Sequence, residues 1–198
     1  NSLNIALQPG VSSRIVNPTK YFDVVLYEGT GASNGVSGYN FAPDFVWVKR
    51  TDGANGQNLF DVLRGPGNYI QSGSINQQGT DADELESFDP TGFTYGGNPG
   101  GNASGGNYVG WCWKAGGKKG TFNIDDVAYA SAAAASMDVG DLTVTGCSVG
   151  TRNKFSIVKY TGNGSNDQTV AHGLGAIPAF VMVKDLDNTM DWCVKHKD

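Results

Sequence analysis

The sequence of 198 residues lacks several features that mark common functional classes. It has no apolar run close to the roughly 18 residues that a membrane-spanning helix needs. Its 14 Lys and Arg residues are outnumbered by 19 Asp and Glu residues, which gives a formal net charge of −5. A nucleic-acid-binding surface needs clustered positive charge, and the one short basic cluster, Lys114 with Lys118 and Lys119, lies in a glycine-rich stretch typical of a solvated turn. The composition therefore argues against nucleic acids and membranes as partners.

Cysteine and histidine are also scarce. The three cysteines, Cys112, Cys147 and Cys193, are odd in number and widely spaced, so they indicate no disulfide framework. We expect them to be reduced, buried thiols that behave as small hydrophobic side chains. Cys193 and His196 have a C-x-x-H spacing, but a zinc site needs two more ligands at suitable positions. The sequence therefore predicts neither a metal nor a cofactor.

Motifs of the common catalytic classes are missing as well. The sequence contains no G-x-S-x-G, no H-E-x-x-H and no phosphate-binding loop. Nothing singles out one pair among the acidic residues as the two carboxylates of a glycosidase. Two acidic groups are weak candidates for calcium: Asp81, Asp83, Glu84 and Glu86, and also Asp185, Asp187 and Asn188. Neither has the ligand spacing of calcium loops, so we interpret both as solvated acidic turns and expect no enzyme.

What the sequence does contain is an internal repeat, in which Phe22–Lys49 resembles Phe155–Lys184. The first half of the repeat matches at an offset of 133 (155 − 22), and the second half matches at 135 (173 − 38). The matching positions are Phe22, Val25, Tyr27, Gly29 and Gly31, and then Gly38, Pro43, Phe45, Val46, Val48 and Lys49. A repeat of this length is typical of a duplicated small domain and too long for a solenoid.

The two copies differ in extent. The first continues through Trp113 to about Gly117, whereas the sequence reaches Asp198 soon after the second copy's Lys184. Because the chain also begins with Asn1, we expect it to be a segment of a longer polypeptide. The expected organisation has four parts: an extension or linker at 1–20, a first module at 21–117, a connector with a short helix at 118–154, and the start of a second module at 155–198.

Strand patterns dominate the chain. Alternating aromatic and β-branched residues predict strands at 21–27, 44–49, 59–63, 108–114 and 141–149, and two short strands around a tight turn at 87–95. One helix is predicted at 125–137, because Asp125 and Asp126 suit a helix N-terminus and the following alanines favour helix. Many short strands with glycine-rich turns predict an all-β fold, an antiparallel β-sandwich with one short helix, followed by the start of a second similar module.

Two glycine-rich loops, 65–79 and 96–106, are the candidate ligand-binding segments. Exposed tyrosines such as Tyr39, Tyr69 and Tyr95 are able to stack on sugars, and the alternative is that they are partly buried in the sandwich. The residues that we single out for ligand binding are Gly65, Asn68, Tyr69, Tyr95, Asn98, Asn102 and Asn107. His172 is expected to be a structural turn residue, because the first copy has Ser37 in its place.

Several segments together resemble a known module. They are YFDVVLYEGTG, FAPDFVWVK, LFDVLRGPGNYI, SFDPTGFTYGG, NYVGWCWKAGG, FNIDDVAYASAAAASM and FSIVKYTGNG. Across roughly residues 18–198 the chain resembles a repeated β-rich module of virion proteins from tailed bacteriophages, especially marine ones. The resemblance implies a concanavalin-like, SPRY-like or jelly-roll sandwich in a tail fibre or other virion protein. It also implies a homo-oligomer, often a trimer, that is located in the virion and contacts other tail proteins.

Three functions remain open at this point. The favoured one is a tail fibre or related appendage that takes part in attachment to a glycan or protein on the host surface. The second is an architectural tail, adaptor or capsid-fibre protein that binds no receptor. The third is a polysaccharide depolymerase of the virion, for which the resemblance supplies no catalytic residues.

Overall fold

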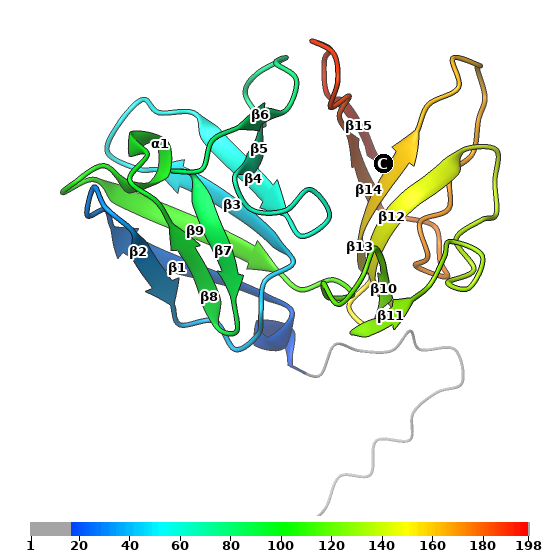
Figure 1. The fold of residues 1–198 in the computed structure, drawn as a ribbon, viewed down its shortest axis with the longest axis horizontal. Helices are drawn as coiled ribbons and strands as arrows, with labels where there is room; N and C mark the ends of the chain where they lie inside the picture. Colours follow the sequence, from blue (N-terminus) through cyan, green and yellow to red (C-terminus); the bar gives the residue numbers. More distant parts are fainter. Residues whose placement is uncertain (1–16, 198) are drawn as a thin grey trace, which may run out of the picture.

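The structure, a computed structural model, describes residues 17–197 and consists mainly of short β-strands (Figure 1). Most strand pairs are antiparallel and the described residues contain one short α-helix, which confirms the predicted all-β fold class. The first half of the chain contains η1 (Pro18–Lys20), β1 (Phe22–Glu28), β2 (Asn34–Ser37), β3 (Phe45–Arg50), β4 (Gln57–Asp61), β5 (Asn68–Gln71), β6 (Gly79–Thr80), β7 (Leu85–Asp89), β8 (Gly92–Tyr95), α1 (Pro99–Asn102) and β9 (Asn107–Trp113). The second half contains β10 (Phe122–Ile124), β11 (Val127–Tyr129), β12 (Thr143–Gly150), β13 (Phe155–Thr161), β14 (Phe180–Val183) and β15 (Cys193–His196).

The first half is a sandwich of two antiparallel sheets. A six-stranded sheet in the order β1-β9-β3-β4-β5-β6 packs on a three-stranded sheet in the order β2-β8-β7. The alternation of β3 decides which side chains enter the core: Val46 and Val48 are fully buried between the sheets, whereas Phe45 and Trp47 lie on the outer face. On that outer face Trp47 packs edge-on against Trp111 of β9. The core is therefore built from the inward-facing half of each predicted strand.

The second half has its own small core and two further sheets. A four-stranded sheet in the order β11-β10-β12-β13 includes one parallel pair, β10 with β12, and β14 pairs with β15. The core beside this sheet includes Met137, Val144, Cys147, Val149 and Leu174. Residues 118–154, which we expected to be a connector with a helix, therefore hold three strands and part of a core.

The helix predicted at 125–137 is wrong. Ile124 pairs with Val127 in an antiparallel hairpin, so Asp125 and Asp126 form its two-residue turn. Both aspartates have positive φ values, 48° and 66°, as a type I′ turn requires. The alanine-rich stretch that follows is a series of turns that ends at Ser136, with φ of 53°. The acidic pair suited a tight hairpin as well as a helix N-terminus, and the pairing with β12 decided between them.

The internal repeat extends further in space than in sequence. The pair β14–β15 has the same register as the pair β3–β4, shifted by 135 positions. The equivalent pairs are Phe45↔Asp61 and Phe180↔His196, Val46↔Phe60 and Val181↔Lys195, Trp47↔Leu59 and Met182↔Val194, and Val48↔Asn58 and Val183↔Cys193. The second copy therefore includes a counterpart of β4, although the sequence of β15 bears no resemblance to it.

A lysine closes the loop of both hairpins in the same way. The ammonium group of Lys49 donates hydrogen bonds to the carbonyls one and six positions further along the chain, at 2.8 and 3.0 Å. Lys184 does the same at 3.1 and 2.9 Å. The lysine shared by both copies thus has an identical structural role, because its charge satisfies loop carbonyls that no strand partner reaches.

The two halves meet at a junction of buried polar contacts. Asp44, at the start of β3, is 1% exposed, and its carboxylate accepts hydrogen bonds from the backbone N–H groups of Ala115 and Gly117 at 2.7 and 3.0 Å. It also pairs with the Lys114 ammonium at 2.9 Å, which in turn contacts Asp126 at 2.6 Å. Burial opposes the charge of Lys114, but the two carboxylates raise its pKa above the usual value.

Aromatic side chains complete the junction. Phe155, the first residue of the second copy, stacks on Trp113 with 6.1 Å between ring centroids and meets Phe45 edge-on at 6.0 Å. The module that we expected at 21–117 therefore packs directly against the second copy of the repeat. Of the cysteines, Cys112 and Cys147 are buried as expected, whereas Cys193 is exposed, because nothing in the described chain covers that position of β15.

Candidate functional site

The loops at one end of the first sandwich meet around α1, and Asn102 is at their centre. Its side chain is fully buried. The amide nitrogen donates to the carbonyls of Ala32 and Gly96, and the amide oxygen accepts from the Thr30 N–H at 2.8 Å and from the Asn34 amide at 3.1 Å. One asparagine thus joins the β8–β9 loop to the β1–β2 loop and the start of β2 through three hydrogen bonds, and a fourth, to Gly96, lies within the β8–β9 loop. We therefore correct the prediction that Asn102 faces a ligand.

Two tyrosine hydroxyls of the six-stranded sheet donate hydrogen bonds to backbone carbonyls of α1. Tyr27 of β1 donates to the carbonyl of Gly101 at 2.7 Å, and Tyr108 of β9 donates to the carbonyl of Pro99 at 2.9 Å. The Tyr108 hydroxyl also accepts from the Ala103 N–H at 2.9 Å. The glycine-rich loop 96–106 is in this way fixed to the sheet, because its backbone groups find partners on neighbouring strands.

A buried carboxyl group lies under the same helix. Glu84 is 4% exposed, and the Asn58 amide donates to its two oxygens at 3.1 and 2.9 Å. The Tyr95 hydroxyl donates to the same carboxyl group. Burial raises the pKa of Glu84 to about 7, and the nearby charge of Asp81 adds to this effect while the Asn58 hydrogen bond opposes it. Our interpretation of this acidic group as a solvated turn is therefore wrong for Glu84.

Sequence reasoning missed this carboxyl cluster for a simple reason. Asn58 lies 26 positions from Glu84 and 37 positions from Tyr95, so no local motif connects the three residues. Tyr95 itself is fully buried, as is Tyr39 at 2% exposure, which excludes both as sugar-stacking surface residues. The alternative that these tyrosines belong to the sandwich interior is the one that the structure supports.

The remaining predicted residues of this end, Asn98 and Asn107, are partly or fully exposed. Asn98 begins α1, and its side-chain oxygen accepts from the Gly100 N–H at 2.7 Å. Asn107 donates to Asp52 from both its backbone and its amide, each at 3.1 Å. Asp52 also pairs with Arg50 at 2.7 Å, and this contact lowers the pKa of Asp52 to about 2. The exposed rim is thus polar and held by local hydrogen bonds.

The second predicted loop, 65–79, is not one loop: it contains part of the β4–β5 turn, strand β5 with Asn68 and Tyr69, and the β5–β6 loop. Gly65 has φ of 84°, which favours glycine at this turn, and Tyr69 is half-buried. The Asn68 amide donates to the carbonyl of Arg64 at 2.7 Å, and its oxygen accepts from the Thr80 hydroxyl at 2.8 Å. These hydrogen bonds use the polar groups of Asn68 within the turn, so the side chain serves the loop itself.

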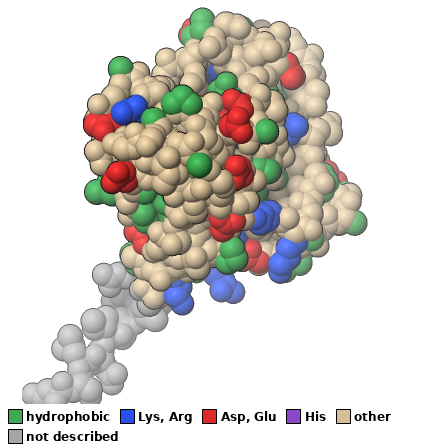
Figure 2. All heavy atoms as spheres, turned by 60° about the vertical axis from the view of Figure 1, so that its left-hand side comes forward, with side chains coloured by type: hydrophobic (Ala, Val, Ile, Leu, Met, Phe, Trp, Pro, Cys, Tyr) green, Lys and Arg blue, Asp and Glu red, His purple; other side chains and the backbone are tan. Residues whose placement is uncertain are grey.

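Asp81 brings the two predicted loops together. Its backbone N–H donates to the carbonyl of Gly67 at 2.9 Å, and its carboxylate accepts from the Asn98 amide at 2.9 Å. The structure therefore joins the loops that the sequence suggested separately, through a residue that we had assigned to an acidic turn. The face of the molecule drawn in Figure 2 consists mainly of uncharged polar and backbone atoms, with separate charged and apolar side chains.

Within residues 17–197 the possible metal ligands form no cluster: no three side chains of the His, Cys, Asp and Glu types are placed to hold a metal ion. His172 accepts a hydrogen bond from the Leu174 N–H at 3.1 Å through Nδ1, in agreement with the predicted structural role. The carboxylate of Asp185 accepts from the N–H groups of Asp187 and Asn188, so this acidic group closes a turn of the β14–β15 loop.

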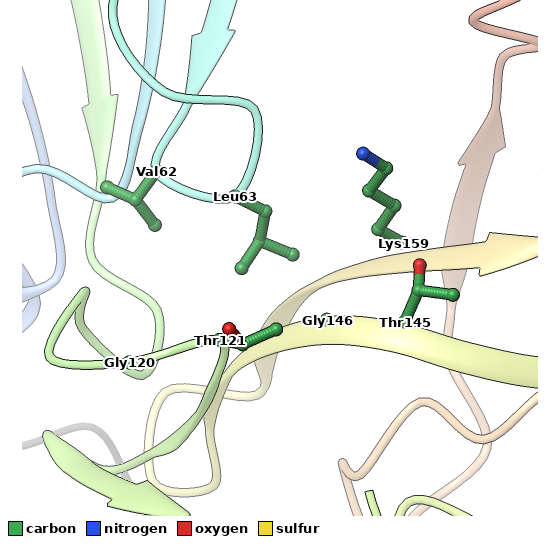
Figure 3. A pocket seen from close by; sticks show the side chains of 7 residues that line it. All are labelled: Val62, Leu63, Gly120, Thr121, Thr145, Gly146 and Lys159. Carbon is green, nitrogen blue, oxygen red and sulfur yellow. The ribbon is translucent and has the colours of Figure 1, made fainter. Parts of the chain in front are cut away.

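A shallow cleft of about 350 Å³ lies between the two halves (Figure 3). Val62 and Leu63 face it from the first half, and Thr121, Thr145 and Lys159 face it from the second. Lys159 is its one charged lining residue, and no carboxylate or histidine reaches it. This lining offers no acid–base pair and no nucleophile with an adjacent base.

Comparisons with known proteins place the chain in a family. A family model described as a domain of unknown function (DUF7483) matches residues 17–198. The chain belongs to the DUF7483 family. The matched range covers both copies of the repeat, so the DUF7483 domain includes the second half as well as the first sandwich. No curated protein and no solved structure matches the chain. No helix of the described residues is long and apolar enough to span a membrane.

Proposed function

We propose that this DUF7483 chain is a structural module of a bacteriophage virion, part of a tail fibre or related appendage that takes part in attachment to the host surface. The motifs that resemble tailed-phage modules support this proposal, and they span the same residues as the family match. A location in the virion, neighbouring tail proteins and assembly as a homotrimer belong to the same proposal.

The observation that carries the proposal is the way in which the duplicated strands are joined. Asp44 holds the segment between the two halves through two backbone hydrogen bonds, and Phe155 packs against Trp113. Contacts of this kind limit the movement of one module relative to the next, whereas a glycine and serine linker would leave it free. A fixed orientation between successive β-modules suits an extended appendage, because such an appendage has to be stiff along its length.

The α1 end of the first sandwich is the surface that we propose for contact with the host. Its loops are held from below by Asn102 and Tyr108, and they present an exposed polar rim that includes Ser104 and Asn107. A rim of this kind suits weak hydrogen bonding to a glycan or a polar protein surface. Several copies in one appendage would then turn weak single contacts into firm attachment.

The first experiment is to locate the chain in the intact particle by electron cryo-microscopy. Density at the tail periphery is the expected result and would support the appendage. Density in a ring around the tail tube or in an array on the capsid would overturn the attachment role and favour the architectural alternative. The proposed trimer is checked independently by light scattering on the purified protein.

The second experiment measures binding of the purified protein to host cells. We expect the double substitution Ser104→Ala and Asn107→Ala to weaken cell binding by about tenfold, because two exposed hydrogen-bonding groups of the rim are lost. The matched control is Asn163→Ala with Ser165→Ala in an exposed loop of the second half, which we expect to bind as the unchanged protein does. Equal binding by both double variants would contradict the assignment of the rim. Release of reducing sugar from host polysaccharide would instead favour the depolymerase.

A further inference from the structure

The first copy of the repeat contains a strand, β9, that has no counterpart among the described residues of the second copy. In the first copy β9 lies between β1 and β3 and pairs with both, so that Trp113 is opposite Phe22 on one side and Phe45 on the other. In the second copy β13 repeats β1, and β14 repeats β3. Among the described residues, β13 pairs only with β12 and β14 pairs only with β15.

The strand β12 does not take the place of β9. In the first copy, the hydrogen bonds from Gly29 N–H to Gly106 and from Lys114 N–H to Tyr21 show that the odd-numbered residues of β1 face β9. Their counterparts in β13 are Ser156, Val158 and Tyr160. If β12 took the place of β9, it would therefore hydrogen-bond to the backbone of these three residues.

The hydrogen bonds of β12 show instead that it pairs with the other edge of β13. Cys147 N–H donates to Thr121, and the carbonyl of Val149 accepts from Asp125, so both residues direct their backbone groups towards β10. Ser148, which lies between them, therefore faces β13, where it is opposite Ile157. Ile157 thus faces β12, and the backbone groups of Val158 point to the opposite edge of β13. That free edge is the one that corresponds to the β9 side of β1.

In β14, the edge away from β15 corresponds to the edge of β3 that pairs with β9. Lys197 N–H donates to the carbonyl of Ala179, which fixes Val181 and Val183 as the residues that face β15. Phe180 and Met182 therefore direct their backbone groups to the other edge, as Phe45 and Trp47 direct theirs to β9. Among residues 17–197, these two strand edges thus have no backbone partner. We call them together the open strand position and define it by Ser156–Tyr160 of β13 and Phe180–Met182 of β14.

Apolar side chains of the β14–β15 hairpin are more exposed than their counterparts in the first copy. Val46 and Val48 of β3 are 0% and 1% exposed, whereas Val181, the counterpart of Val46, is 39% exposed. Phe180 and Val194 in the same hairpin are 54% and 57% exposed. Apolar side chains on an unpaired strand edge are a recognised site for the addition of another strand.

We propose that the open strand position binds one extended polypeptide segment that repeats the pattern of β9, antiparallel to both β13 and β14. The register of the first copy specifies its chemistry: a large apolar side chain opposite Phe155 and Phe180, as Trp113 is in β9, and a small residue opposite Val158, as Gly110 is. This inference does not depend on the proposed function.

A synthetic peptide with the sequence of residues 106–114, carrying Ser at the position of Cys112, is the probe. Amide hydrogen exchange of the labelled protein is followed by NMR with and without the peptide. We expect exchange at Ser156, Val158, Tyr160 and Met182 to slow by at least about tenfold, because these N–H groups gain partners. Phe155 and Ile157 already face β12, so their exchange should not change.

The matched control is the same peptide with N-methyl groups at the positions of Tyr108, Gly110 and Cys112, which removes the hydrogen bonds to β13 and keeps the side chains. It should give no protection of β13. A weakly binding peptide is tested again after attachment to Asp198 through a flexible linker, which raises its effective concentration to the millimolar range.

Three results would overturn the proposal. The first is absence of protection with the attached peptide, and the second is equal protection by the methylated control. The third is protection of β13 that appears without peptide and grows with protein concentration, because this would mean that two copies of the chain pair edge to edge.

Discussion

Individual buried polar residues fix the loops around α1. Asn102 and Glu84 each lie in the interior and have several partners, and both come from segments whose composition is typical of exposed turns. A buried polar group without partners costs more free energy than a folded protein easily tolerates, so these residues constrain the loops strongly. Glu84 also makes the stability of the protein depend on pH.

Glu84→Gln should reduce that pH dependence. The folded protein raises the pKa of Glu84 from its ordinary value of 4.5 to about 7, so the neutral carboxyl is favoured in the folded state. Its contribution to stability is fully present below pH 4.5 and is lost as the pH rises towards 7. Relative to Glu84→Gln, the unchanged protein should lose up to about 3 kcal/mol across this window. Urea unfolding at several pH values measures the difference.

Glu86→Gln is the matched control, because Glu86 is an exposed neighbour in the same acidic group. Its stability should follow the pH dependence of the unchanged protein. Parallel stability curves for the Glu84→Gln variant and the unchanged protein would mean that folding does not raise the pKa of Glu84.

At the scale of elements, turns with left-handed backbone decide where strands begin and end. The β10–β11 hairpin depends on two consecutive aspartates in this conformation, and the turns after it end at Ser136, with φ of 53°. Glycine adopts positive φ without the steric cost that other residues carry. Ser136 is exposed, so its backbone conformation can be tested without disturbing a core.

Ser136→Gly should raise the stability of the second half by up to about 1 kcal/mol, because the left-handed conformation no longer carries the cost of a Cβ atom. Thermal unfolding measures the change. Gly164→Ala is the reverse change: Gly164 has φ of 74° and open space around it, so only the conformational cost applies. We expect it to lower the stability by a similar amount. A loss of stability in both variants would show that the Ser136 side chain has a role of its own.

At the scale of the whole molecule, two cores share one junction. The first is closed between the sheets of the first half, and the second surrounds Met137 and Cys147. Asp44 connects them, because its buried carboxylate holds the chain where it passes from one half to the other. Unfolding of the two halves should therefore be coupled through this residue.

Asp44→Asn should lower the stability by about 2–4 kcal/mol, because a neutral amide oxygen accepts these hydrogen bonds more weakly than a carboxylate does and removes one of the two negative charges beside Lys114. It should also separate the unfolding of the two halves. Tryptophan fluorescence reports mainly on the first half, which holds Trp47, Trp111 and Trp113, and the slow reactivity of the buried Cys147 thiol, distinct from that of the exposed Cys193, reports on the second. The two signals should coincide in the unchanged protein and diverge in the variant.

Asp52→Asn is the control for this comparison, since Asp52 forms an exposed ion pair with Arg50. Its effect on stability should be small, because solvent screens the exposed pair, and the two signals should remain together. Coincident signals in Asp44→Asn would show that the aromatic contacts of Phe155 couple the halves without the carboxylate.

The strands and the repeat could be predicted because both are local properties of the sequence. Alternating side chains indicate β1, β3 and β9 directly, and the repeated valines of β3 and β14 are visible at one offset. The loop residues could not be assigned in the same way. Tyr95 and Asn102 have the composition of an exposed loop, and their burial depends on strands that arrive from elsewhere in the chain.

The sequence by itself determined the all-β class, the duplication and most strand positions, because side-chain periodicity acts over a few residues. The tertiary structure alone decided that 125–137 is a hairpin and turns, that Glu84 is buried, and that β9 enters between β1 and β3. Each of these depends on groups far apart in the chain, such as Asn58 and Glu84, which only folding brings into contact. The open strand position of the second copy has the same origin, since a strand edge is free or paired only in the assembled sheet.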